Sequence, residues 1–260
     1  MAAFIFIIFF CCCFSNSNAQ VAEWKSATAT YSTDSDDSIV TEGACGYGDL
    51  HKTSYGKYST GLSGMLFDRG SSCGACFEVR CARTQTQTQT QTQTQWCLPG
   101  SPSILLTATD FCPPNYALPA DDGGWCNFPR AHFQMPEPAF SLIAHLTPQI
   151  LPIHYRRATC QREGGIRFTI KGSASFMQVL ISNVGLDGEV VAVKVKGSRT
   201  GWIPMGRNWG QNWQCNTDLI GQPLSFEVTT AAWRTLTSYT VAPQNWKFGQ
   251  TFIGKQFQHS

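Results

Sequence analysis

The chain has 260 residues, which is enough for one large domain or two of ordinary size. It carries 19 lysines and arginines against 17 aspartates and glutamates, a formal net charge of +2 that argues against binding nucleic acid through a basic surface. Twelve cysteines, 23 glycines and 12% aromatic residues favour a loop-rich all-β protein over a helical one.

The N-terminus has the pattern of a secretory signal peptide. Residues 4–14 are apolar and uncharged, and Ser17 and Ala19 form a small-x-small cleavage site, so we predict removal of residues 1–19. A retained anchor and a buried strand are the alternatives. Because the run is shorter than the roughly 20 residues of a membrane span, and no later segment is as apolar, we expect no integral membrane segment in the mature chain.

Three cysteines lie in the leader, and eight of the other nine precede residue 161. In an oxidising compartment these eight would form up to four disulfides and leave one thiol over. The alternative is a zinc site at Cys73-Gly-Ala-Cys76, but no second C-x-x-C or nearby Cys/His pair completes four ligands. We therefore predict disulfides and no metal. The nine are Cys45, Cys73, Cys76, Cys81, Cys97, Cys112, Cys126, Cys160 and Cys215.

The first segment, about residues 21–160, contains short β-like runs at 77–81 and 104–109, the second apolar enough to be buried on both faces. A helix is predicted over about 138–146, with Pro138 in its first turn. Six Thr-Gln repeats at 84–95 are interpreted as a solvated insert of variable length, although Gln-rich tracts can also self-associate.

A polar connector at 161–165 leads into the second segment, where short strands recur about every ten residues, as in a β-sandwich. Asp187-Gly188 separates two of these runs and predicts a β-hairpin between them. The predicted strands are at 166–170, 177–181, 189–195, 224–228 and 238–241.

Five of the eight tryptophans fall in this second segment. Trp209 and Trp213 are four residues apart, so on one strand they would share a face about 13 Å apart. Large rings beside Asn and Gln side chains suit sugar binding, because pyranose faces stack on rings while amides bond the hydroxyls. We expect Trp213, Trp233 and Trp246 in the core and Trp209 at the surface.

Asp110 follows the buried run 104–109 and is expected at a barrel rim, where it is equally a functional acid or a turn-capping residue. His132 is expected to be structural. The glycine-rich stretch 43–48 lacks the Gly-Lys-Ser/Thr ending of a phosphate loop, and no G-x-S-x-G motif is present, so we predict no cofactor.

Ten motifs in order give the mature chain, apart from the Thr-Gln insert, a close resemblance to the plant α-expansins. They are Gly43 to Gly48, Ser72 to Glu78, Thr107 to Pro114, Gly123 to Asn127, His132-Phe133, Tyr155 to Arg157, Gly164 to Phe168, Lys196 to Trp202, Arg207 to Trp213 and Asn245 to Gln250.

The resemblance implies a six-stranded double-psi β-barrel at 43–165, similar to family-45 endoglucanases, followed by an immunoglobulin-like carbohydrate-binding β-sandwich at 175–255. It leaves Cys215 unpaired. The disulfides that it implies are Cys45–Cys73, Cys76–Cys160, Cys81–Cys97 and Cys112–Cys126.

The function implied is that of a secreted, monomeric plant cell-wall protein that disrupts non-covalent contacts between cellulose and matrix glycans such as xyloglucan, without hydrolysis. No catalytic residue and no cofactor are implied. Two alternatives stay open: a weak β-glucan endoglucanase that uses Asp110 with another acid, and a cellulose-binding protein whose barrel is inactive.

The resemblance implies polysaccharide-binding residues in both domains, and the chain departs from the family at four positions of the first. Ser32 stands in place of a Tyr, Thr33 in place of a Gly, Asp110 in place of a frequent Asn, and Gln134 in place of the Asp of a His-Phe-Asp motif. An amide cannot donate a proton as a carboxylic acid does, so Gln134 makes hydrolysis less expected still. The implied binding residues are Thr30, Tyr31, Asp110, His132, Phe176 and Trp209.

Overall fold

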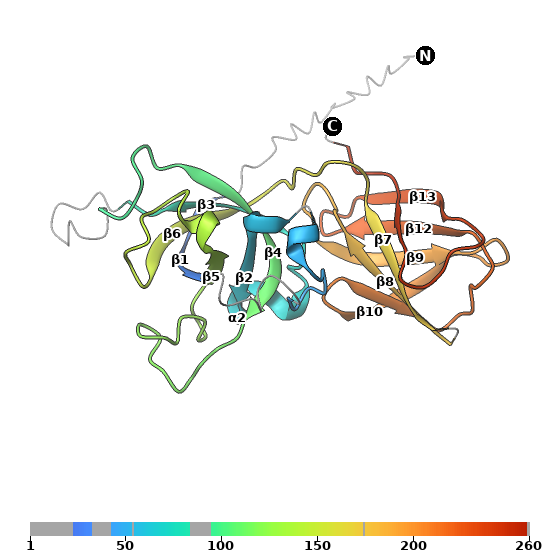
Figure 1. Ribbon diagram of the computed structural model, residues 1–260, viewed down its shortest axis with the longest axis horizontal. Helices are drawn as coiled ribbons and strands as arrows, with labels where there is room; N and C mark the ends of the chain where they lie inside the picture. Colours follow the sequence, from blue (N-terminus) through green and yellow to red (C-terminus); the bar gives the residue numbers. More distant parts are fainter. Residues whose placement is uncertain (1–22, 33–42, 54, 84–94, 174, 259–260) are drawn as a thin grey trace, which may run out of the picture.

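The computed structural model describes residues 23–32, 43–53, 55–83, 95–173 and 175–258, which form two β-rich units side by side (Figure 1). The signal peptide expected at 1–19 and residues 84–94 of the Thr-Gln insert lie outside the described residues. Within the described part of the chain, no helix is long and apolar enough to cross a membrane.

The first unit is the expected six-stranded barrel. Its strands close in the order β1-β5-β2-β4-β3-β6, with the pairs β1–β5 and β2–β4 parallel. Buried Leu62, Phe77, Phe133 and Leu151 fill its interior. The elements are β1 (Lys25–Ser32), η1 (Leu50–Lys52), η2 (Gly56–Tyr58), β2 (Ser59–Ser63), α2 (Gly64–Phe67), η3 (Asp68–Gly70), β3 (Cys76–Cys81), β4 (Ser103–Cys112), β5 (His132–Pro136), α3 (Glu137–Phe140) and β6 (Leu151–Ala158).

The helix predicted over 138–146 is wrong in extent, because α3 ends at Phe140. The residues that follow bond instead to the segment around Cys97: Leu98 N–H donates to the Ile143 carbonyl at 3.0 Å, and His145 N–H donates to the Trp96 carbonyl at 2.8 Å. Tertiary pairing therefore overrides a local apolar period that strongly resembled a helix.

The structure contains the four disulfides that the resemblance implies, all within the barrel unit or at its exit. Cys73 is bonded to Cys45 and Cys76 to Cys160, so neither sulfur of the C-x-x-C pair is available to a metal and the zinc alternative is wrong. Cys215, in the second unit, is buried and unpaired.

The second unit is a sandwich whose strands follow the order β13-β12-β9-β10-β11-β8-β7-β14. Strand β10 belongs to both layers, since Ile203–Met205 pair with β9 and Gly206–Trp209 pair with β11. Phe168 and Phe226 stack between the layers at 4.5 Å. The strands are β7 (Arg167–Ser173), β8 (Phe176–Ser182), β9 (Val190–Lys196), β10 (Ile203–Trp209), β11 (Asn212–Cys215), β12 (Leu224–Thr230), β13 (Thr235–Ala242) and β14 (Thr251–Ile253).

The hairpin predicted at Asp187-Gly188 is wrong. Strand β8 pairs with β7 and β11, whereas β9 pairs with β10 and β12, so residues 183–189 connect different layers. Trp209 and Trp213 likewise do not share one strand. Trp209 ends β10 and Trp213 lies in β11, after a turn at Gly210.

Trp213 and Trp246 lie in the sandwich core as expected. Trp233 does not: it is 82% exposed, in the turn between β12 and β13, with a φ of +58°. Its placement follows from the turn, where Trp233 N–H donates to the Thr230 carbonyl at 2.9 Å and leaves the side chain outside the core.

The two units pack tightly against each other through backbone. Gln211 N–H donates to the Cys45 carbonyl at 3.0 Å, and its side-chain Nε2 donates to the Cys73 carbonyl at 2.8 Å. The turn that joins β10 and β11 is therefore fixed against the barrel.

Strand β1 lies upstream of the expected barrel start at residue 43, and β7 upstream of the expected sandwich start at 175.

Candidate functional site

Four paired positions form a row across strands β1, β5, β2 and β4. Thr30 pairs with Gln134, Gln134 with Gly61, and Gly61 with Asp110. Laterally paired residues project their side chains to the same face of a sheet. A Cβ at Gly61 would lie 3.7 Å from both Cβ and Oε1 of Gln134, so the glycine forms a floor between an amide and a carboxyl group.

Asp110 lies inside β4, two residues before its end, and is half-buried. Its Oδ1 accepts the backbone N–H of Ala44 at 2.6 Å and of Phe111 at 2.7 Å. Burial raises the pKa of Asp110 more than these two bonds lower it. The carboxyl therefore both borders the row and holds the loop at 43–46.

His132 lies beneath the row and is fully buried. Its Nδ1 is 2.8 Å from the Thr28 hydroxyl and its Nε2 is 2.9 Å from the Thr30 hydroxyl. Burial, with a smaller contribution from the charge of Arg130, lowers the pKa of His132 to about 3. The ring is therefore a neutral, fully buried partner of the Thr30 hydroxyl.

Tyr31 does not join Thr30 in the row, because successive side chains of a strand point to opposite faces. Its ring centroid lies 5.1 Å from that of Phe140, and its hydroxyl donates to the Leu146 carbonyl at 3.0 Å. The aromatic ring expected to bind sugar is thus part of the packing that supports β1.

Trp209 lies where the sandwich meets the barrel and is 48% exposed. A Cβ at Gly46 would be 2.9 Å from its ring, so the indole lies directly against the loop at 43–46. The same loop is bonded to Asp110 through Ala44. One short loop therefore connects the row on the barrel to the exposed indole of the sandwich.

Phe176 and Trp209 share the outer face of one sheet. Trp209 pairs with Asn212, which pairs with Leu180, and Leu180 is on the same side of β8 as Phe176, four residues earlier. Phe176 is 36% exposed. Between the two rings the paired amides of Gln178 and Gln214 occupy this face.

The chemistry available in the row is limited to binding. Glycoside hydrolysis ordinarily needs two carboxyl groups flanking the bond, and the row holds one, on Asp110, opposite the amide of Gln134. No group of three or more metal-ligating side chains occurs among the described residues.

Sequence reasoning missed Gly61, Gln178 and Gln214. No local signal identified Gly61, because its role depends on having Gln134 on one side and Asp110 on the other, which only strand register shows. The two glutamines could have been found from the alternation of polar and apolar residues along β8 and β11.

Two family models match the chain. One, described as the expansin C-terminal domain, matches residues 166–243, which cover most of the sandwich. The other, described as a lytic transglycolase, matches residues 59–155 of the barrel.

Among relatives, Expansin-A13 of Arabidopsis thaliana is 51% identical over 244 residues, covering 94% of this chain and 88% of the relative. Expansin-A10 of Oryza sativa subsp. japonica is 50% identical over 241 residues, covering 92% and 89%.

Among solved structures, the apo form of an expansin from Clavibacter michiganensis matches with a TM-score of 0.67 at 16% identity, over 92% of this chain and all of that one. A mutant of the same bacterial protein in complex with cellohexaose matches with a TM-score of 0.66 at 15% identity, over 92% and 100%. These structures share the two-unit fold. With about half of its residues identical to those of two plant expansins over nearly its whole length, the chain belongs to the expansin family.

Proposed function

We propose that this expansin loosens plant cell walls by holding a β-glucan strand along one surface that extends from the barrel row to the aromatic face of the sandwich. It acts without hydrolysis. The observation that carries the proposal is the loop at 43–46, which is bonded to Asp110 at one side and lies against Trp209 at the other. A strand bound at both places would cross the boundary between the units without a break.

Each residue has a distinct part in this surface. Asp110 and Gln134 offer hydrogen bonds to sugar hydroxyls on either side of Gly61, and His132 holds the buried Thr30 hydroxyl beside them. Trp209 and Phe176 offer apolar rings, each able to add about 0.5–1.5 kcal/mol beyond area burial if it stacks on a sugar face. Tyr31 acts indirectly through its packing on Phe140.

Contacts between the protein and the bound glucan replace the contacts that the glucan makes with neighbouring chains, and the free energy of binding offsets their loss. Since no covalent bond changes, the protein separates cellulose from matrix glycans of the xyloglucan kind and dissociates unchanged. The cellohexaose complex of the bacterial expansin, which has the same fold, supports a β-glucan as the class of ligand. We further propose that the chain is secreted into the plant wall and acts as a monomer.

Two exposed tryptophans allow a matched test by extension of heat-killed acidic walls and by cellulose pull-down. Trp209→Ala is expected to weaken cellulose binding about tenfold and to reduce wall creep, because it removes a ring from the surface. Trp233→Ala, which removes an 82% exposed ring outside the surface, is expected to change neither. Equal effects of the two variants, or no creep above buffer with the unmodified protein, would overturn the proposal.

One observation favours a second function, cellulose binding without loosening. Gln134 places an amide in the centre of the row, so the site lacks a second titratable carboxyl opposite Asp110. Gln134→Asp supplies one. If creep occurs only in this variant while cellulose binding is already present in the unmodified protein, the binding-only function is correct; creep in both supports loosening.

A further inference from the structure

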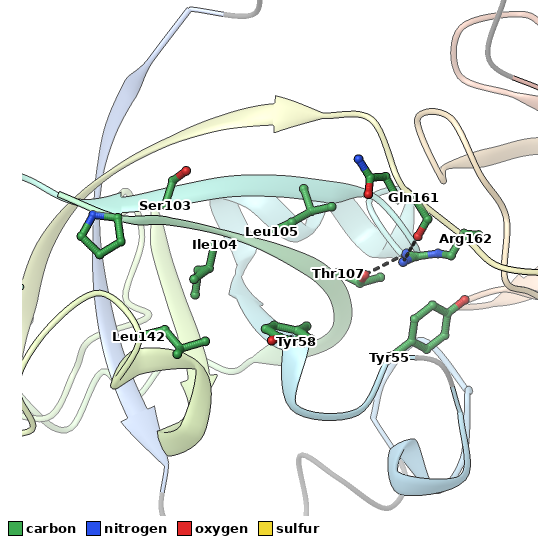
Figure 2. A pocket seen from close by; sticks show the side chains of 10 residues that line it. Tyr55, Tyr58, Ser103, Ile104, Leu105, Thr107, Leu142, Gln161 and Arg162 are labelled. Atoms are coloured by element: carbon green, nitrogen blue, oxygen red, sulfur yellow. Dashed lines mark hydrogen bonds between the residues drawn. The ribbon is translucent and has the colours of Figure 1, made fainter. Parts of the chain in front are cut away.

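A cleft of about 580 Å³ opens on the barrel outside the glucan surface (Figure 2). It lies between the first half of β4, the residues that precede β2, and the connector that leads to the sandwich. None of the residues that line it belongs to the row of Thr30, Gln134, Gly61 and Asp110. Its size is in the range of small-ligand sites.

One end of the cleft is cationic. Arg162 Nη2 donates to the Thr107 hydroxyl at 2.8 Å and contacts the Cys76 sulfur at 3.2 Å, while Nη1 reaches the Gln161 carbonyl at 3.4 Å. The guanidinium also lies 4.9 Å from the centre of the Tyr55 ring. Figure 2 shows Arg162 beside Thr107 at this end. The cation is therefore held in a fixed position.

The charge of Arg162 is not neutralised by an ion pair with any residue that the structure describes. Its Nε is buried without an acceptor among those residues. A guanidinium offers five N–H donors, more than the acceptors present here can use. Because a partly desolvated cation without a partner is unfavourable, an anion entering the cleft would be stabilised.

The other end of the cleft is apolar and open to solvent. Tyr58 and Leu142 are 43% and 39% exposed, and Ile104 and Leu105 line the wall beside them. Figure 2 shows Tyr58 between Leu142 and the arginine end. A ring and aliphatic side chains next to a fixed cation match a ligand with an apolar face and one negative group.

We propose that this cleft binds a carboxylate-bearing sugar, a uronic acid unit of an acidic glycan, with its carboxylate on Arg162 and its ring against Tyr58 and Leu142. Planar carboxylates suit the guanidinium fork. The site is separate from the glucan surface, so the protein can hold an acidic glycan and a β-glucan at the same time. This inference does not depend on the proposed wall-loosening function.

Arg162 also braces the connector against the barrel, and that role explains its contacts with Thr107 and Cys76. It does not explain the exposed apolar wall at Tyr58 and Leu142. The test therefore changes Leu142, which is exposed and contributes little to the fold, as well as Arg162.

The probes are trigalacturonic acid and its methyl ester, which lacks the negative charges and carries small methyl groups in their place, titrated into the mature protein and followed by calorimetry and NMR shifts. We expect the acid to bind at least tenfold more tightly than the ester. Trp209→Ala is expected to leave this binding intact, since the indole belongs to the other surface. Equal affinities for acid and ester, or no binding of the acid, would overturn the inference.

Two matched pairs of variants locate the site. Leu142→Asp is expected to weaken binding of the acid at least tenfold, and Leu142→Lys to preserve or strengthen it, because only the sign of the added charge differs. Arg162→Gln is expected to abolish the preference for the acid, whereas Arg199→Gln, an exposed arginine of the sandwich, retains it. Indistinguishable Leu142→Asp and Leu142→Lys variants would contradict the assignment even if Arg162→Gln failed to fold.

Discussion

Two titratable residues of the barrel site, His132 and Asp110, respond to burial in opposite directions. Burial penalises the charged form of each group, so the pKa of the imidazole is lowered to about 3 and the pKa of the carboxyl is raised. His132 therefore stays neutral at mildly acidic pH, and Asp110 gains protons more readily than a free aspartate. The two groups give folding stability opposite dependences on pH.

For His132, we predict that stability falls as the pH drops from about 6.5 toward 3. In this window the unfolded chain binds a proton at His132 that the folded chain does not, so protons favour unfolding. His132→Asn should remove this part of the slope, on the order of a few kcal/mol across the window, while losing some stability at neutral pH. Denaturant unfolding as a function of pH measures both; parallel curves for the two proteins would refute the prediction.

For Asp110 the sign is reversed. Above the unfolded pKa of 3.8 and up to the raised pKa of the folded state, the folded chain holds a proton that the unfolded chain has lost, so stability decreases as the pH rises through this window. Asn at this position can still accept the N–H groups of Ala44 and Phe111. We therefore expect Asp110→Asn to raise the melting temperature at pH 7 and to give little change at pH 3. A variant that is less stable at pH 7 would show that the bonds of the carboxylate outweigh its burial.

At the scale of elements, the site depends on the register of four strands, and Gly61 is the position that tests it. A Cβ there meets no atom closer than 3.7 Å, so the sheet accepts a Cβ in contact with the flexible Gln134 side chain. Gly61→Val should change stability by less than about 1 kcal/mol, since β-branched residues suit strands. Its methyl groups would fill the floor between Gln134 and Asp110.

We expect Gly61→Val to weaken binding of cello-oligosaccharides about tenfold in calorimetric titration. Gly64→Ala is the control, because its Cβ would meet only Phe111, at 3.9 Å, and it lies outside the row. Unchanged binding in a folded Gly61→Val protein would mean that no ligand crosses the row at this point.

The elements also show what the sequence could and could not predict. Strands at 77–81 and 224–228 were found because their residue pattern is local. The hairpin at Asp187-Gly188 failed because a turn signal does not say which strand will be the neighbour, and β8 and β9 have other partners. The prediction of a helix over 138–146 was wrong for a related reason, because backbone groups of Ile143 and His145 form hydrogen bonds with the segment around Cys97.

In the candidate site, too, features that depend on local residue patterns could be predicted, and features that depend on strand pairing could not. Trp209 could be predicted as a surface residue from its Gly and Asn neighbours. Tyr31 and His132, taken from the resemblance, lie on β1 and β5 next to the row, where the Tyr31 ring packs on Phe140 and the buried His132 contacts the Thr28 and Thr30 hydroxyls. Which face a side chain takes depends on register, and no pattern within β1 alone shows that Thr30 shares a face with Gln134 while Tyr31 packs on Phe140.

At the scale of the whole molecule, the proposed continuous surface requires the barrel and the sandwich to keep a fixed relation. Arg157 of the barrel pairs with Glu189 of the sandwich side at 2.8 Å, and the Tyr55 hydroxyl accepts the Asn183 N–H at 2.8 Å. The backbones also approach closely at Gly210, where a Cβ would lie 2.5 Å from the Cys45 carbonyl carbon and oxygen. These contacts, more than the connector at 161–165, determine where Trp209 lies relative to Asp110.

Gly210→Ala tests this dependence, with Gly221→Ala as its matched control. Both glycines have positive φ, +52° and +70°, so each variant bears a left-handed alanine at a cost of roughly 1–2 kcal/mol. Only at Gly210 does the new methyl group also collide with backbone of the other unit, because Gly221 has no atom within 4 Å. We expect Gly210→Ala to separate the units, with thermal unfolding split into two transitions, a larger radius of gyration in solution scattering, and wall creep lost while each unit stays folded. Gly221→Ala should keep a single transition and its creep; if both variants behave alike, strain at the glycine and not the interface sets the outcome, and the continuous surface is not what wall loosening requires.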